Sequence, residues 1–105
     1  MSDKNARVSG KRVRFARSAT KHRVSKERIR YVIANCGLAF EEPAPSSSAE
    51  ALDDRLLLCL GDDADGKALE VMVVEGSKGE LVVIHAMELR AKYRDQYEEA
   101  KQWRL

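Results

Sequence analysis

The segment ALEVMVVEGSKGELVVIHAM, residues 68–87, decides the fold. Two stretches rich in Val, Ile and Leu, 68–75 and 80–87, flank GSKG, whose glycines can adopt the positive φ of a tight turn. This pattern predicts an antiparallel β-hairpin. The preceding RLLLCLG (55–61) is a continuous apolar run, which predicts a central strand buried on both faces. The three stretches together predict a meander.

The residues before the meander predict a short strand and a helix. The stretch 11–17 alternates basic and apolar side chains, which is typical of a half-buried strand. Ser18 can cap a brief helical turn that reaches His22. Ser25 is the expected N-cap of a longer helix, with a hydrophobic staple across the cap, and Gly37 is its expected end.

The remaining segments complete a single α+β domain. Residues 38–41 are a candidate strand, and 41–54, with two prolines and three consecutive serines, predict a mobile surface loop. Apolar residues at helical spacing predict a last helix from 89 to 104. We expect one domain over 11–105, after a flexible basic tail at 1–10. Its sheet is expected to be antiparallel, with about four strands and helices packed on one face.

Charge is distributed unevenly along the chain. The net charge is +2, but residues 1–30 carry +9, because eleven Lys and Arg residues accompany only Asp3 and Glu27. A localised basic block attracts polyanions even when the total charge is small. The N-terminal third therefore predicts contact with nucleic acid or with an acidic protein, with a solvated tail as the alternative.

Composition argues against several functional classes. Cys36 and Cys59 lack a CxxC spacing, so we expect buried thiols in a reducing cytoplasm. No apolar run reaches the roughly 18 residues of a membrane span, and the polar N-terminus lacks the core of a secretory signal. The stretch DDADG (62–66) resembles a calcium loop, but the ligand frame would place Gly61 first and Met72 last. Neither side chain can supply the oxygen ligand that a calcium loop needs at these two positions. The sequence predicts a cytoplasmic protein without a membrane span, metal site or cofactor.

The last third of the chain carries the candidate catalytic residues. His85 lies near the end of a predicted strand, where alternation places it on the same face as Val83. Imidazole titrates close to neutral pH, so His85 is a candidate general acid or base, with a structural histidine as the alternative. Arg90, Lys92 and Arg94 follow in the first turns of the predicted helix. Cations there oppose the helix dipole, which favours a ligand role.

Other polar residues are candidates for contact with phosphate. Arg55 precedes the apolar strand and can clamp a phosphate or pair with Asp53 or Asp54. Lys21 and His22 lie between two predicted helical segments, where they form either an RNA contact or a polar turn. The further candidates for RNA contact are Arg14, Arg17, Lys92 and Arg94.

The ordered set of motifs resembles the BrnT-like toxins of the RelE superfamily. The motifs are ATKHRVSKERIRYVIAN, FEEP, RLLLCLG, GKALEVMVVE and LVVIHAMELRAKYRDQYEEA, and they span about residues 13–99. The resemblance implies a RelE-like fold and a small ribosome-independent ribonuclease. It also implies a ribbon-helix-helix antitoxin as partner, with the complex repressing its own operon.

Residue by residue, the resemblance is incomplete. Lys21, His22 and Arg55 match positions that the family places at its RNA-facing surface. Where BrnT-like proteins typically read I-S-A-R at the end of the last strand, this chain reads I-H-A-M at 84–87. Met87 therefore stands in place of a catalytic-type arginine, and a histidine replaces the serine.

Two hypotheses follow for the activity. In the first, the chain is an endoribonuclease that needs no metal: His85 is the acid or base, Arg90 and Arg55 clamp the phosphate, and Lys21 is a second cation. In the second, it is a non-catalytic toxin-like module that binds nucleic acid or the antitoxin. The expected assemblies are a hetero-oligomer with the antitoxin or a homodimer through the apolar last helix, whose packing on its own sheet is the alternative.

Overall fold

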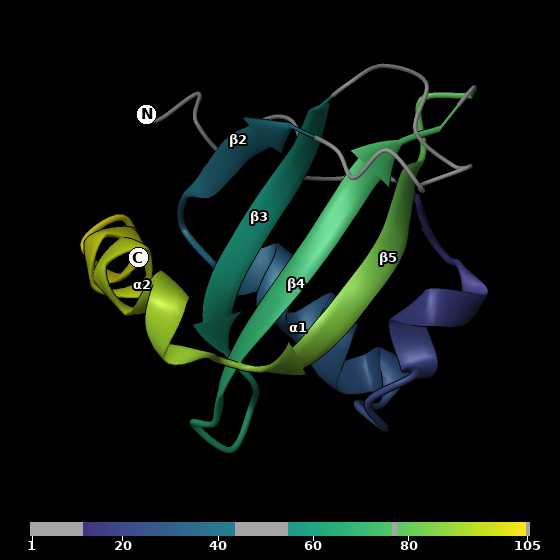
Figure 1. Cartoon of the computed structure of the whole chain (residues 1–105). Coiled ribbons are helices and arrows are strands. Elements are labelled where there is room, and N and C mark those ends of the chain that lie inside the picture. Colours follow the sequence, from purple (N-terminus) through teal and green to yellow (C-terminus); the bar gives the residue numbers. More distant parts are fainter. Residues whose placement is uncertain (1–11, 44–54, 77, 105) are drawn as a thin grey trace.

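The computed structural model describes residues 12–43, 55–76 and 78–104 (Figure 1). The elements in chain order are β1 (Val13–Phe15), the 3-10 helix η2 (Arg17–Thr20), α1 (Lys26–Asn35), β2 (Ala39–Pro43), β3 (Arg55–Asp62), β4 (Ala68–Glu75), β5 (Leu81–Glu88), the 3-10 helix η3 (Ala91–Tyr93) and α2 (Arg94–Lys101). The predicted tail at 1–10 lies outside the described residues. So does the predicted loop at 41–54, except that residues 41–43 belong to β2.

The α+β class is confirmed, but the sheet differs from the expected one. Within the described residues it has five strands, in the order β1-β5-β4-β3-β2. The pairs from β5 to β2 are antiparallel, whereas β1 is parallel to β5, so the sheet is mixed. Backbone hydrogen bonds from Leu81 N to Arg12 O and from Ala16 N to Val83 O hold β1 there. The N-terminal strand thus lies beside the last strand of the chain.

The two helices lie on opposite faces of the sheet, so the expectation of helices on one face is wrong (Figure 1). The physical reason is β3, where successive residues are apolar and each face must be covered. One cluster joins α1 to the sheet through Ile29, Val32, Ile33, Leu57, Cys59 and Val71. The other joins η3 and α2 to the sheet through Tyr93, Tyr97, Leu56, Leu58 and Leu60.

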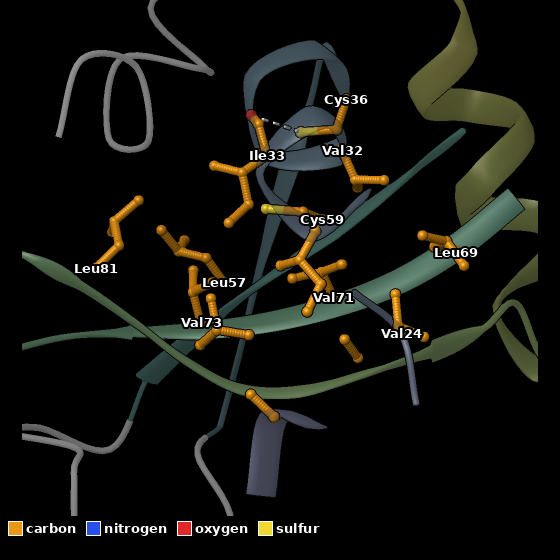
Figure 2. Close-up of a cluster of buried hydrophobic side chains, with 14 residues drawn as sticks. Val24, Val32, Ile33, Cys36, Leu57, Cys59, Leu69, Val71, Val73 and Leu81 are labelled. Carbon is orange, nitrogen blue, oxygen red and sulfur yellow. Dashed lines mark hydrogen bonds between the residues drawn. The ribbon is translucent and has the colours of Figure 1, made fainter. Parts of the chain in front are cut away.

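Cys36 and Cys59 lie in the core between α1 and β3 (Figure 2). Both side chains have no exposed surface and neither is in a disulfide, so the prediction of buried, unbridged cysteines is confirmed. The hydrogen bond between the two thiols is the main cause that lowers the pKa of Cys36 and raises that of Cys59. Burial acts on both thiols to raise the pKa.

The local signals around α1 are confirmed, while those around η2 are not. Ser25 Oγ accepts a hydrogen bond from Arg28 N, at 3.3 Å, as an N-cap does. Gly37, just beyond the helix, has a φ of +82°. Ser18, however, caps nothing, because its Oγ donates to the carbonyl oxygen of Ile84 at 2.6 Å. That bond ties η2 to β5.

The C-terminal end of α2 packs against the turn after α1. Tyr97 donates its hydroxyl hydrogen bond to Asp62 at the end of β3, and Arg104 Nη1 lies 3.3 Å from Asp62 Oδ2. A Cβ added at Gly37 would stand 2.8 Å from the carbonyl carbon of Trp103. No helix within the described ranges is long and apolar enough to cross a membrane.

We expect Gly37→Ala to destabilise the protein more than Gly66→Ala. Both glycines have positive φ, so alanine at either position costs about 1–2 kcal/mol in the left-handed region. Only Gly37 also has backbone atoms within 3.0 Å of the added methyl, whereas nothing lies within 4 Å of it at Gly66. Urea unfolding of the two variants measures the difference, and equal losses would contradict close packing at Gly37.

Candidate active site

A buried glutamate on the central strand β4 organises the candidate site. Glu70 has no exposed surface, although its neighbours in β4 are apolar. Its Oε1 accepts a hydrogen bond from the backbone N–H of Arg90 at 2.9 Å. Its Oε2 lies 2.6 Å from Arg90 Nη2, 2.9 Å from Arg90 Nε and 3.0 Å from His85 Nε2. A buried carboxylate requires such partners, because removing it from water is otherwise costly.

His85 reaches Glu70 because β5 is irregular at this point. The pairing of β4 with β5 shifts register, from Met72 opposite His85 to Val73 opposite Val83, which leaves Ile84 as the extra residue of a β-bulge. The expectation that His85 shares a face with Val83 is therefore wrong. Val83 packs in the cluster under α1, whereas His85 lies on the Glu70 face with its side chain 22% exposed.

Arg90 lies in an extended segment between β5 and η3, not in the first turns of a helix as expected. Its φ and ψ are −90° and 153°, and α2 begins only at Arg94. The extended backbone directs both the N–H and the guanidinium of Arg90 at the same carboxylate. The side chain of Arg90 is 41% exposed. Glu70 uses the Nε–H and one N–H of Nη2, so the two N–H groups of Nη1 and the second N–H of Nη2 are the donors left for a second anion.

The contacts set the charge of each group. Burial would raise the pKa of Glu70, but hydrogen bonds from Arg90 and His85 and the charge of Arg90 outweigh it, so the pKa lies below its ordinary value. Burial also lowers the pKa of His85, and Glu70 only partly offsets this. At neutral pH the cluster therefore holds an ionised Glu70, a charged Arg90 and a neutral His85.

His22 meets His85 from the other end of the chain. Their ring centroids are 5.5 Å apart with an interplanar angle of 71°, an edge-to-face contact. The loop that carries His22 is constrained on both sides. Ala19 of η2 is completely buried, and Arg23 adopts a φ of +62°, which is uncommon for a residue other than glycine. Such strained positions cluster at functional sites.

The other basic residues predicted for the site are exposed on β1, η2, η3 and α2 and on the turn after η2. Lys21 is exposed and adjacent to His22 in the chain. Arg14 and Arg17 are exposed on β1 and η2, with Arg14 Nε 3.7 Å from Glu80. The ammonium of Lys92 lies 5.0 Å from the ring centroid of Tyr93, and Arg94 lies similarly over Tyr97.

The structure does not bring Arg55 to His85. Glu70 pairs with Leu60 near one end of β3, and Arg55 begins the opposite end, five residues away. At 3.3 Å per residue this separation is about 16 Å along the strand. Asp53 and Asp54, the ion-pair partners considered for Arg55, lie outside the described residues.

The functional residue that sequence reasoning missed is Glu70. The available signal was its position in ALEVMVVE, where it interrupts an otherwise apolar strand. Glutamate is almost never fully buried unless it is paired. A glutamate within a strand that is expected to be buried thus predicts a cationic or imidazole partner, although it does not identify that partner.

The arrangement is suited to proton transfer. An ionised carboxylate can only accept, so the hydrogen bond with Glu70 assigns the proton of neutral His85 to Nε2. Nδ1 then carries the lone pair and can accept a proton from a substrate. Both oxygens of Glu70 already accept N–H hydrogen bonds, so this carboxylate is arranged to orient His85 and Arg90.

We expect Glu70→Gln to reduce the loss in the free energy of unfolding that occurs as the pH falls below neutrality. The folded pKa of Glu70 lies below its unfolded value of about 4.3, so its stabilisation is complete above that pH and is lost as the pH falls through the folded pKa. Urea unfolding between pH 7 and pH 2.5 should show a smaller loss for the variant than for the wild type. Asp63 and Glu80, whose pKa values are also lowered, contribute equally to both proteins. Parallel curves would contradict an ionised Glu70.

Arg90→Ala should destabilise the fold far more than Arg94→Ala. Breaking a buried ion pair costs about 3–5 kcal/mol, and we expect the lower end because the backbone N–H of residue 90 and His85 still bind Glu70. Arg94 makes an exposed i,i+4 pair with Glu98, at 3.5 Å, which is worth about 0.3–0.5 kcal/mol. Chemical denaturation measures both, and similar losses would contradict the role assigned to Glu70.

Comparisons with protein-family models, curated proteins and solved structures found no match for this chain. The resemblance to BrnT-like toxins therefore stays a prediction from the sequence motifs. The functional interpretation of the cluster depends on the contacts of Glu70, His85, Arg90 and His22.

Proposed function

We propose that this protein is a metal-independent endoribonuclease and the toxin component of a toxin–antitoxin pair. The observation that carries the catalytic part is the buried Glu70, which orients His85 and holds Arg90 in one partly exposed cluster. A neutral, oriented imidazole beside a guanidinium is the combination required for acid–base cleavage of a phosphodiester.

The mechanism assigns a task to each group. Nδ1 of His85 exchanges a proton with the reacting ribose or leaving oxygen, while Glu70 fixes the tautomer through Nε2. Arg90 stabilises the negative charge that develops on the non-bridging phosphate oxygens, through the N–H donors that Glu70 does not use. Lys21, which is exposed and next to His22 in the chain, is a second cation for the substrate. Arg55 receives no task at the reacting phosphate because of its place at the far end of β3.

The basic residues of β1, η2 and α1 support RNA as the substrate. Ala16 and Ser18 bond β5 at Val83 and Ile84, and His22 meets His85 one residue further on. This segment therefore follows β5 toward His85, and its exposed cations are Arg14, Arg17, Lys21 and Arg23. Lys26 and Arg30 are further exposed cations on α1, which packs on the other face of the sheet. Phosphate contacts by Lys and Arg supply most of the sequence-independent affinity for nucleic acid.

The toxin part of the proposal is supported by the ordered BrnT-like motifs over about residues 13–99. It names a ribbon-helix-helix antitoxin as the protein partner and the cytoplasm as the compartment, where RNA is available and thiols stay reduced. The RelE-like identity of the fold belongs to the same proposal. A RelE-like fold would have to share the mixed five-stranded sheet of the described residues, with helices on both of its faces.

A non-catalytic binding module is the second candidate function, and the ion pair of Arg90 favours it. Because Nε and Nη2 of Arg90 are used by Glu70, much of its charge is already neutralised inside the protein. The exposed cations of η2 and α1 would still bind RNA or an acidic antitoxin segment. This candidate predicts salt-sensitive binding without turnover.

We expect wild-type protein to cleave RNA in excess chelator and to leave a 2′,3′-cyclic phosphate. His85→Ala should lower the rate about 10²–10⁴-fold, the usual contribution of a positioned acid or base. Lys78→Ala, which removes an exposed charge in the turn between β4 and β5, is the matched control and should cleave normally. The products are resolved by gel electrophoresis and mass spectrometry.

The alternative outcomes separate the two candidates. Equal rates for wild type and His85→Ala would remove the catalytic assignment. Intact RNA with folded wild-type protein, together with binding that weakens as salt rises, would favour the binding module.

A further inference from the structure

The two histidines of the chain meet in the fold although 63 positions separate them. The rings of His22 and His85 make an edge-to-face contact with centroids 5.5 Å apart. The sequence motifs give His22 a general place on an RNA-facing surface, whereas the contact places it next to the proposed base. A phosphate group that touches one ring is therefore within reach of the other.

The contact is built by the fold and is not a chance approach of two exposed side chains. Hydrogen bonds from Ala16 N to Val83 O and from Ser18 Oγ to Ile84 O fasten the preceding segment to β5. Arg23 N then donates to Thr20 O and takes a left-handed conformation, which reverses the chain directly after His22. The loop thus positions His22 from both sides.

The two imidazoles differ in their surroundings. His85 is held by Glu70 through Nε2, is mostly buried and is neutral at neutral pH, as a base must be before it accepts a proton. His22 is exposed, so its ring is open to solvent and to a substrate at the surface. The pair therefore has one ring suited to each half of an acid–base reaction.

From these contacts we infer that His22 is the general acid of the reaction and His85 its general base, an assignment that rests on the proposed function. His85 Nδ1 takes the proton of the ribose 2′-hydroxyl as the 2′-oxygen forms a bond to phosphorus. The bond from phosphorus to the 5′-oxygen breaks, and His22 gives its proton to that oxygen. The products are a 2′,3′-cyclic phosphate and a 5′-hydroxyl, and solvent returns the two histidines to their starting states.

A substrate with an altered leaving group tests the acid. In an oligonucleotide whose 5′-bridging oxygen is replaced by sulfur, the departing thiolate leaves without a proton. His22→Ala should lower cleavage of ordinary RNA about 10²–10⁴-fold and cleavage of the sulfur-bridged RNA less than tenfold. His85→Ala should slow both substrates by at least 100-fold, because the 2′-hydroxyl still has to lose its proton. Lys78→Ala is the control and should match wild type on both substrates.

Each other outcome is decisive. If His22→Ala cleaves ordinary RNA at the wild-type rate, or is slowed equally on both substrates, His22 is not the acid, and the ribonuclease proposal stands on wild-type cleavage alone. Wild-type protein that cleaves neither substrate overturns the ribonuclease proposal and the acid assignment together. His22 is exposed, so circular dichroism of His22→Ala should match the wild type and exclude misfolding as the cause.

Discussion

The interaction on which the structure depends is the pairing of a carboxylate, buried in the sheet, with a guanidinium and an imidazole. Glu70 cannot stay ionised without exposed surface unless N–H donors replace the water it has lost. Arg90 supplies one main-chain and two side-chain donors, which fixes the chain where it leaves β5. His85 supplies the other donor and is oriented in return. One buried charge therefore sets both the path toward α2 and the tautomer of the candidate base.

Much of the fold could be predicted, because it follows from local patterns. Apolar runs and glycine turns predict the hairpin, and Ser25 and Gly37 mark the ends of α1. The candidate site was harder to predict from the sequence. The bulge that moves His85 to the Glu70 face has no local sequence signature, since a one-residue shift leaves the apolar pattern of β5 intact. The pairing of β1 with β5, which brings His22 to His85, joins segments too distant for periodicity to connect.

The candidate site draws on both ends of the described chain. β1 and η2 occupy one edge of the sheet and carry His22, while Arg90 lies on the segment that leads to α2. Glu70, on the central strand, lies between these contributions. Because contacts between segments distant in sequence form only after long loops close, the site is expected to assemble late in folding. Partly folded chains would then lack the complete cluster, although they retain the hairpin.

Cys36 and Cys59, which are buried under α1, make local opening of the core measurable by thiol labelling. Neither sulfur meets solvent, so a thiol-specific dye can react only when α1 separates from β3. The rate of labelling would therefore report how often the core opens on the face opposite Glu70, and the natural cysteines make an engineered probe unnecessary.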